Sequence, residues 1–221
     1  MPKGRAHEIA LEFLADAFRT ILQEDEDGII PLVGLPGEKR LIDRLEEYCY
    51  QKGFTNAQFM QLEGLLGKPL QEYIEHHFFK NLSDHLNLFM YLPKTPFIWH
   101  LSSGIHQGFE CYILIYKWNQ DSLFKLKSKY LSLREESLQN RLIQLADTNT
   151  VQALAEKERI GKQLEEIETF NNKLDELIEE GYNPILDSGV GKNIAPLQKK
   201  GLLRCDVLNP KQLKTYLEAD W

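Results

Sequence analysis

Residues 97–101 read FIWHL and residues 109–116 read FECYILIY, two runs of aromatic and β-branched residues in a sequence otherwise patterned for helices. Such residues favour β-strands. The intervening residues 102–107 include two serines and Gly104, which are typical of a turn. The sequence therefore predicts two antiparallel strands joined as a hairpin. Because an isolated hairpin is only marginally stable in water, we expect a helix or a third strand to pack against it.

The residues that follow this hairpin predict two long helices. Apolar residues keep a helical spacing from Leu123 to Leu133 and resume it one position later at Leu138, which is typical of one long helix with a stutter. The polar residues 147–150 offer N-cap side chains for a second helix, whose apolar stripe covers residues 160–178. Two helices of about 28 residues, each roughly 40 Å long, would form an antiparallel helical hairpin.

Residues 1–92 are expected to form a helical lobe. A first helix ends in the acidic run at residues 24–27, and a short apolar segment follows at residues 29–33. Further apolar stripes at helical spacing predict helices over about residues 38–51, 56–66 and 70–82.

These patterns favour an α+β fold that is predominantly helical, with a helical N-terminal lobe, a small antiparallel β-hairpin, a long antiparallel helical hairpin and an irregular tail. Residues 93–221 would hold both hairpins and the tail, with short helices near residues 196–200 and after Pro210. A length of 221 residues is also compatible with a single domain over the whole chain.

Composition and charge exclude several classes of protein. Hydrophobic residues make up 43% and charged residues 27% of the chain, which are ordinary values for a folded domain. The net charge of -7 argues against a surface that is basic all over, so any contact with nucleic acid must be local. The three cysteines have no zinc-type spacing and favour a reducing compartment. Without a signal peptide pattern or a long apolar run, we expect a cytoplasmic location and no membrane partner.

Motifs for phosphate or metal binding are absent or weak. The run SGVGK at residues 188–192 follows a helix rather than a strand, so we interpret it as a turn. His76 and His77 are adjacent on a predicted helix and would point about 100° apart, which does not suit a shared metal ion. No cofactor-binding or metal-binding residue is predicted.

Histidines and serines gather at the predicted β-hairpin, but a catalytic site is not favoured there. Clusters of this kind are common in turns, and the GxSxG pattern of a nucleophile elbow is absent. The cluster consists of His100, Ser102, Ser103 and His106.

Basic residues concentrate locally in this acidic chain, first beside Trp118 and again in the tail. Lys125 and Lys129 lie four positions apart, so they would share a helix face that could follow a phosphate backbone. The alternative is the solvated face of an amphipathic helix. The candidate DNA-binding residues are Lys117, Lys125, Lys127, Lys129, Arg134, Lys192 and Lys199.

Five segments share a pattern with one protein family. They are DGIIPL at residues 27–32, KTPFIWHLSSG at 94–104, GF at 108–109 with YILIY at 112–116, LFKLKSKYL at 123–131, and LDSGVGKNIAPLQ at 186–198. In this order they resemble the C-terminal region of the PglX-type adenine-specific DNA methyltransferases of bacterial BREX phage-defence systems. Ser188 departs from the pattern, because the family has a second aspartate there.

The resemblance implies part of a larger enzyme. Full-length members of that family bind S-adenosylmethionine and methylate adenine N6, with a glycine-rich cofactor loop and an N-P-P-[YF] motif that holds the flipped base. Neither motif occurs in these 221 residues, so the family's catalytic and cofactor residues map to no position here, and whether the chain itself is an enzyme stays open.

The function that the resemblance implies is a non-catalytic domain that supports DNA target binding. Its partners would be the methyltransferase domain of the same system, duplex DNA and other defence-system proteins. The alternative is a protein-interaction module that docks partner subunits through the helical hairpin. A free-standing enzyme is the third interpretation.

Overall fold

The computed structural model of the chain describes residues 3–88 and 96–218. These residues are mostly helical and contain a small antiparallel sheet, which confirms the predicted fold class. The expected boundary between residues 92 and 93 lies outside the described residues, and the division into two lobes remains a prediction. In the two described ranges, no helix combines the length and apolar character that crossing a membrane requires.

The sheet has three strands in the order β1 (Ile29–Pro31), β3 (Glu110–Leu114) and β2 (Ile98–Ser102), and both strand pairs are antiparallel. Ile113 in the central strand has a register partner in each neighbour. The third strand that the hairpin needs therefore comes from the short apolar segment after the first helix. Every strand residue is buried, so both faces of the sheet are covered.

The first strand of the hairpin lies one residue later than the predicted run at 97–101, and the second strand is shorter than the predicted run at 109–116. The second strand ends at Leu114, where a 3₁₀ turn, η1 (Ile115–Lys117), begins. The Ile115 N–H donates to the carbonyl of Phe97 at 3.0 Å and closes this end of the hairpin. Tyr116 lies beyond the sheet with 52% of its surface exposed.

The N-terminal helices largely follow the prediction. They are α1 (Lys3–Glu24), α2 (Leu41–Gln51), α3 (Asn56–Leu66), α4 (Leu70–His76) and α5 (Phe78–Leu88). The start of α2 is later than predicted because the Asp43 carboxylate accepts hydrogen bonds from the Arg40 N–H and guanidinium and caps the helix there. The single helix predicted over residues 70–82 is wrong, because His77, at φ -126°, interrupts it.

The long helical hairpin forms as predicted. Its first arm consists of α6 (Gln120–Lys125), the π-helical segment η2 (Leu126–Leu131) and α7 (Ser132–Gln144), and its second arm is α8 (Val151–Glu179). A π-helical turn takes one more residue than an α-helical turn, so η2 accounts for the stutter in the leucine pattern. The Thr150 hydroxyl caps α8 by accepting from the Ala153 N–H at 3.2 Å.

The tail is more regular than the sequence suggests. It contains η3 (Leu186–Ser188), α9 (Val190–Lys199) and α10 (Pro210–Glu218). Between α9 and α10 the chain runs along β2, where the Ser102 N–H donates to the Leu202 carbonyl and the Arg204 N–H to the His100 carbonyl, both at 2.9 Å. This segment covers the edge of β2 that β3 leaves open.

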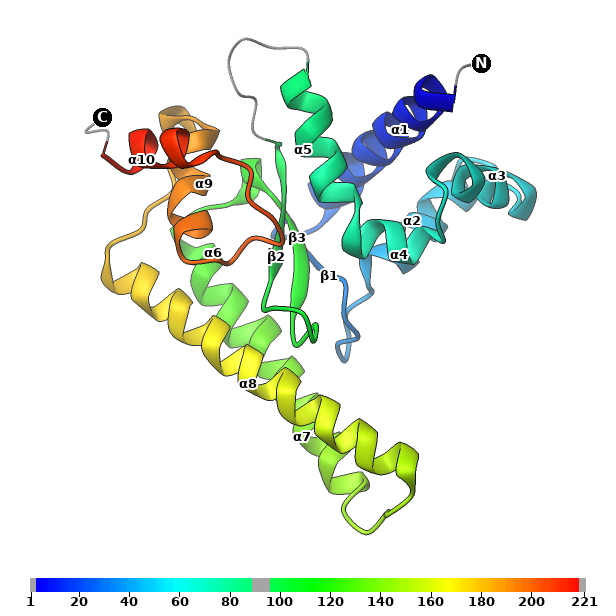
Figure 1. Cartoon of the computed structure of the whole chain (residues 1–221), viewed down its shortest axis with the longest axis vertical. Coiled ribbons are helices and arrows are strands. Elements are labelled where there is room, and N and C mark those ends of the chain that lie inside the picture. Colours follow the sequence, from blue (N-terminus) through cyan, green and yellow to red (C-terminus); the bar gives the residue numbers. More distant parts are fainter. Residues whose placement is uncertain (1–2, 89–95, 219–221) are drawn as a thin grey trace.

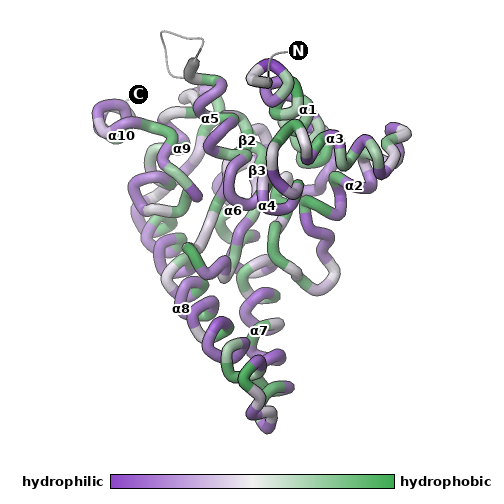
Figure 2. The backbone as a smooth tube through the Cα atoms, turned by 45° about the vertical axis from the view of Figure 1, so that its right-hand side comes forward, coloured by the Kyte–Doolittle hydropathy of each residue, from purple (hydrophilic) through white to green (hydrophobic). Residues whose placement is uncertain are grey.

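One hydrophobic cluster joins the sheet to the helices around it. Phe18 of α1 and Phe78 of α5 lie against Tyr112 of β3, with ring centroids 6.0 and 5.7 Å away. Phe109, next to β3, contacts Phe170 of α8. Figure 1 shows α1 and α5 on one side of the sheet and α6 and α9 on the other. The arms α7 and α8 extend away from this body in both views (Figures 1 and 2).

Candidate functional site

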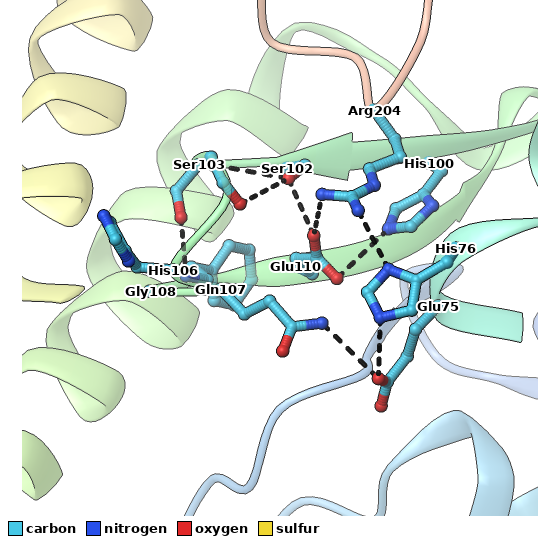
Figure 3. A network of polar contacts seen from close by, with 12 residues as sticks. Glu75, His76, His100, Ser102, Ser103, His106, Gln107, Gly108, Glu110 and Arg204 are labelled. Carbon is cyan, nitrogen blue, oxygen red and sulfur yellow. Dashed lines mark hydrogen bonds and ion pairs between the residues drawn. The ribbon is translucent and has the colours of Figure 1, made fainter. Parts of the chain in front are cut away.

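A network of polar side chains is buried where β2, β3 and the tail meet. Glu110 is fully buried, and its Oε1 accepts hydrogen bonds from the Ser102 hydroxyl (2.8 Å) and the Arg204 guanidinium (3.4 Å). Its Oε2 lies 3.5 Å from Nε2 of His100, and neither of these two atoms has a hydrogen-bond partner among the described residues. Figure 3 shows Glu110 pointing toward these three side chains.

Burial and neighbouring charges set the protonation states of this pair. Removal from water lowers the pKa of His100 and outweighs the opposite effect of the nearby carboxylate. Burial alone would raise the pKa of Glu110, but the contacts with His100, Ser102 and Arg204 hold it below its ordinary value. Burial thus favours the neutral form of the His100 imidazole, whereas the neighbours of Glu110, Arg204 among them, favour its charged carboxylate.

The network reaches the surface through Arg204. Its Nη2 donates to Nδ1 of His76 at 2.8 Å, and Nε2 of His76 lies 3.8 Å from Oε2 of Glu75. The same Glu75 oxygen accepts from the Gln107 side chain at 3.4 Å (Figure 3). These contacts connect the tail, α4 and the β2–β3 loop.

In the predicted cluster of histidines and serines at the hairpin, His100 and Ser102 make contacts within the fold. Ser102 is 5% exposed, and its hydroxyl donates to Glu110 rather than to a histidine. The ring of His100 lies against the ring of Tyr112, with centroids 4.6 Å apart. The arrangement therefore holds strands together and does not present an activated hydroxyl to solvent.

The described residues do not form the glycine-rich loop after a parallel strand that would hold S-adenosylmethionine in an open α/β sheet. Glycine-rich nucleotide and cofactor loops of open α/β sheets follow parallel strands, whereas every strand pair here is antiparallel. The turn after β1 contains two glycines but buries Leu35 between them in the core. His76 and His77 have ring planes 83° apart, and no group of three or more metal-ligand side chains is found in the two described ranges.

Glu166 of α8 holds the β2–β3 loop. Its carboxylate accepts hydrogen bonds from the N–H groups of His106 (2.8 Å) and Gly108 (3.1 Å). It also accepts one from the Ser103 hydroxyl (3.1 Å). A Cβ at Gly104 would lie 2.5 Å from a Glu166 oxygen, and a Cβ at Gly108 would lie 2.5 Å from the Gln163 carbonyl oxygen. These two glycines therefore permit the close approach of the loop to α8.

Asp27 connects the N-terminal strand to the first arm of the hairpin. Its carboxylate accepts a hydrogen bond from the Tyr130 hydroxyl at 2.9 Å. Burial raises the pKa of Asp27, and the neighbouring Asp25 acts in the same direction. Two of the segments that carry the family resemblance are thus joined directly.

Two side-chain amides organise the tail in a similar way. Asn193 bonds both the N–H (3.1 Å) and the carbonyl (2.7 Å) of Ile185. Gln198 bonds both the N–H (2.9 Å) and the carbonyl (2.7 Å) of Leu208. These two amides of the segment at 186–198 therefore satisfy backbone groups within the fold.

Four of the seven predicted DNA-binding residues are engaged inside the protein. Their cationic groups contact carboxylates or backbone carbonyls, and the ammonium groups of the three lysines among them are not free for an external phosphate. The partners are the Asp25 carbonyl for Lys117, Asp175 for Lys127, Glu38 for Lys129, and the Gly108 and Gly34 carbonyls for Arg134.

The other three, Lys125, Lys192 and Lys199, make no hydrogen bond or ion pair within the part of the chain that the structure describes. Lys125 and Lys199 are exposed, and Lys192 is half-buried. The structure thus divides the predicted set into internally paired residues and free ones.

A groove of about 500 Å³ between α7 and α8 contains basic residues that the sequence analysis did not single out. Beside Arg134 it is lined by Arg141 and Arg159. Arg141 follows Arg134 by seven positions and so lies on the same helix face, a spacing that could have revealed it. Arg159 carries no local signal, because antiparallel packing of the two arms brings it to the groove.

Comparison with known proteins relates the chain to adenine-specific methyltransferases. No protein-family model matches it. The chain is 29% identical to the adenine-specific methyltransferase PglX of Lacticaseibacillus casei (strain Zhang) over 112 residues. This aligned region covers 50% of this chain and 9% of PglX. It is 22% identical over 221 aligned residues to the adenine-specific methyltransferase BrxX of Escherichia coli O9:H4 (strain HS), which covers 89% of this chain and 18% of BrxX. The chain is therefore distantly similar to a small part of the PglX and BrxX adenine-specific methyltransferases, and it spans less than a fifth of either.

Proposed function

We propose that this chain is a non-catalytic part of a BREX-type adenine-specific DNA methyltransferase of bacterial phage defence, in which it supports binding of the target DNA. The similarity to BrxX over 89% of the chain carries the proposal. The 221 residues contain neither an N-P-P-[YF] motif nor a glycine-rich cofactor loop, so methyl transfer is assigned to the methyltransferase domain of the same system.

The DNA-binding part of the proposal is supported by the cations without an internal partner. An ammonium group that is already solvated can neutralise a phosphate and release a counterion. An ammonium paired within the fold would first have to leave its carboxylate. Lys125, Lys192 and Lys199 are therefore the predicted residues best suited to contact a DNA backbone.

A binding experiment tests this proposal. Anisotropy of a fluorescent duplex should show binding that weakens steeply with salt. The triple variant Lys125→Glu, Lys192→Glu, Lys199→Glu should bind about tenfold more weakly. The matched control replaces three exposed, internally paired lysines, Lys39, Lys80 and Lys214, with glutamate. Equal affinity of the two triple variants would reject these lysines as DNA contacts, and salt-independent or undetectable binding would reject the DNA-binding function itself.

A second candidate function, docking of the methyltransferase domain or another defence protein, is favoured by the end of the helical hairpin. Ile143, Val151 and Leu154 are 71%, 80% and 52% exposed there. Apolar side chains gathered at the end of a projecting arm are typical of a contact surface. Light scattering of mixtures with the separately expressed methyltransferase domain should detect a complex that Ile143→Ser with Val151→Ser weakens, and the absence of any complex would remove this candidate.

A further inference from the structure

The groove between α7 and α8 is lined by three arginines and one glutamate, so its positive charge is only partly balanced. Pro36 lies at its rim, Leu138 and Ile160 contribute apolar surface, and polar side chains surround them. The polar and charged lining residues are Arg134, Ser137, Asn140, Arg141, Gln144, Glu156, Arg159 and Gln163.

Arg134 is held in place without a carboxylate partner. Its Nε donates to the Gly108 carbonyl at 2.9 Å and its Nη1 to the Gly34 carbonyl at 3.2 Å. Two neutral carbonyls orient the guanidinium but do not cancel its charge. Burial lowers the pKa of Arg134, and the positive charge of Arg159 lowers it further.

The other charged residues of the groove do not neutralise the positive charge of Arg134. Arg141 forms a two-pronged pair with Glu156, with N···O distances of 2.7 and 3.1 Å, so these two charges cancel. Arg159 is exposed and makes no hydrogen bond or ion pair with any described residue. Glu156 also feels the positive charge of Arg159, so the three guanidinium groups that line the groove share one lining carboxylate.

We propose that this groove binds a phosphate group, with Arg134 and Arg159 as its principal ligands. A guanidinium presents several N–H donors in a planar fork that matches phosphate oxygens. Two uncompensated guanidinium groups suit an anion that has several oxygens and carries one or two negative charges. The exposed amides of Asn140 and Gln144 can donate to further oxygens or to the group that carries the phosphate. The inference rests on the proposed function only for the source of the phosphate, which is either a nucleic-acid backbone or a free phosphate compound.

The experiment uses the whole chain and three probes: inorganic phosphate, adenosine 5′-monophosphate and a short fluorescent duplex. Calorimetry measures the first two and anisotropy the third. The decisive variant is Arg159→Gln, because Arg159 makes no hydrogen bond or ion pair with any described residue, so the substitution removes no such contact from the fold. Lys162→Gln is the matched control, since it removes the same charge from the same helix outside the groove, where Lys162 pairs with Glu158.

The expected result is that Arg159→Gln weakens binding of at least one phosphate probe about tenfold, while Lys162→Gln binds as the unmodified chain does. If Arg159→Gln weakens binding of the duplex, the phosphate belongs to a nucleic-acid backbone. If it weakens binding of the small probes alone, the phosphate belongs to a free phosphate compound. The inference is overturned if Arg159→Gln and Lys162→Gln behave alike with every probe, or if no probe binds. If Arg159→Gln changes the binding of no probe while the Lys125, Lys192 and Lys199 variant loses duplex binding, the groove proposal is overturned and the proposed function stays in place.

Discussion

The root of the helical hairpin and its far end use polar and apolar residues in opposite ways. At the root, where the hairpin meets the sheet, the carboxylates of the buried Glu110 and the half-buried Glu166 accept hydrogen bonds from hydroxyls, backbone N–H groups and a guanidinium. At the far end, Ile143 and Val151 are mostly exposed, and Arg141 and Glu156 form a surface ion pair. The segments that resemble the methyltransferase family thus maintain the structure, whereas the end of the arm, which carries none of these segments, has exposed apolar side chains.

The largest expected effect comes from removing the carboxylate at the centre of the buried network. Glu110→Ala should lower the free energy of unfolding by about 3–5 kcal/mol, because loss of one buried partner leaves the others unsatisfied. Urea denaturation followed by circular dichroism measures this. Glu158→Ala, which removes an exposed carboxylate from the arm, is the control and should leave the midpoint unchanged. Equal urea midpoints of the two variants would contradict the difference in stability that is proposed between the root and the arm.

Glycine-to-alanine substitutions in the β2–β3 loop and in the arm should change the free energy of unfolding in opposite directions. Gly108→Ala forces a Cβ to within 2.5 Å of the Gln163 backbone oxygen and should destabilise the protein by about 2–3 kcal/mol. Gly161→Ala in α8 meets no atom within 4 Å and should stabilise it by roughly 0.5–1 kcal/mol, since alanine favours the helix. Thermal denaturation of both variants measures the difference, and a destabilised Gly161→Ala would show that this face of α8 is not free.

A smaller effect is expected from acid. Because the folded protein lowers the pKa of His100, the unfolded chain binds more protons once the pH falls below the ordinary value of about 6.5, and stability declines. The lowered pKa of Glu110 adds a second decline as the pH falls below the ordinary carboxyl value of about 4.3. Urea midpoints measured in buffers on both sides of these values should show the two stages.

His100→Gln serves as the control for this pH dependence. It should remove the first decline and keep the second, because glutamine has no proton to gain in this range. Retention of the first decline in His100→Gln would assign it to another group.

The smallest effect is expected at the end of the arm. Ile143→Ser should change the free energy of unfolding by no more than about 0.5 kcal/mol, because the side chain is already in water. Thermal denaturation measures it. A large loss of stability would mean that this residue packs within the fold, and the comparison would then no longer hold at the arm.

The helical elements could be predicted from the sequence because their signals are local. The bounds of α3 and the stutter that η2 absorbs follow from leucine spacing and capping residues. The third strand could not be predicted in the same way, because a three-residue strand has no periodicity and its identity depends on pairing with β3, which is distant in the chain. The break at His77 was missed because no proline or glycine marks it.

The candidate site was less accessible to sequence reasoning. Charge counting identified Lys127 and Lys129 but could not show that Asp175 and Glu38 pair with them, since these carboxylates come from other helices and loops. Arg159 was missed for the same reason, because its significance depends on the facing arm. Motif comparison indicated the relatives but not that Asn193 and Gln198 serve the backbone of the tail.

The segment at residues 202–204 pairs with the outer edge of β2 although it lies far along the chain from the three strands of the sheet, and this arrangement has a consequence for biosynthesis. During translation β2 and β3 emerge well before the segment that covers the outer edge of β2, because β3 ends at Leu114 and that segment begins at residue 202. Until then, that edge is an open template for pairing with other chains. Folding should therefore finish only after residue 204 has left the ribosome, and products that stop before it should tend to aggregate.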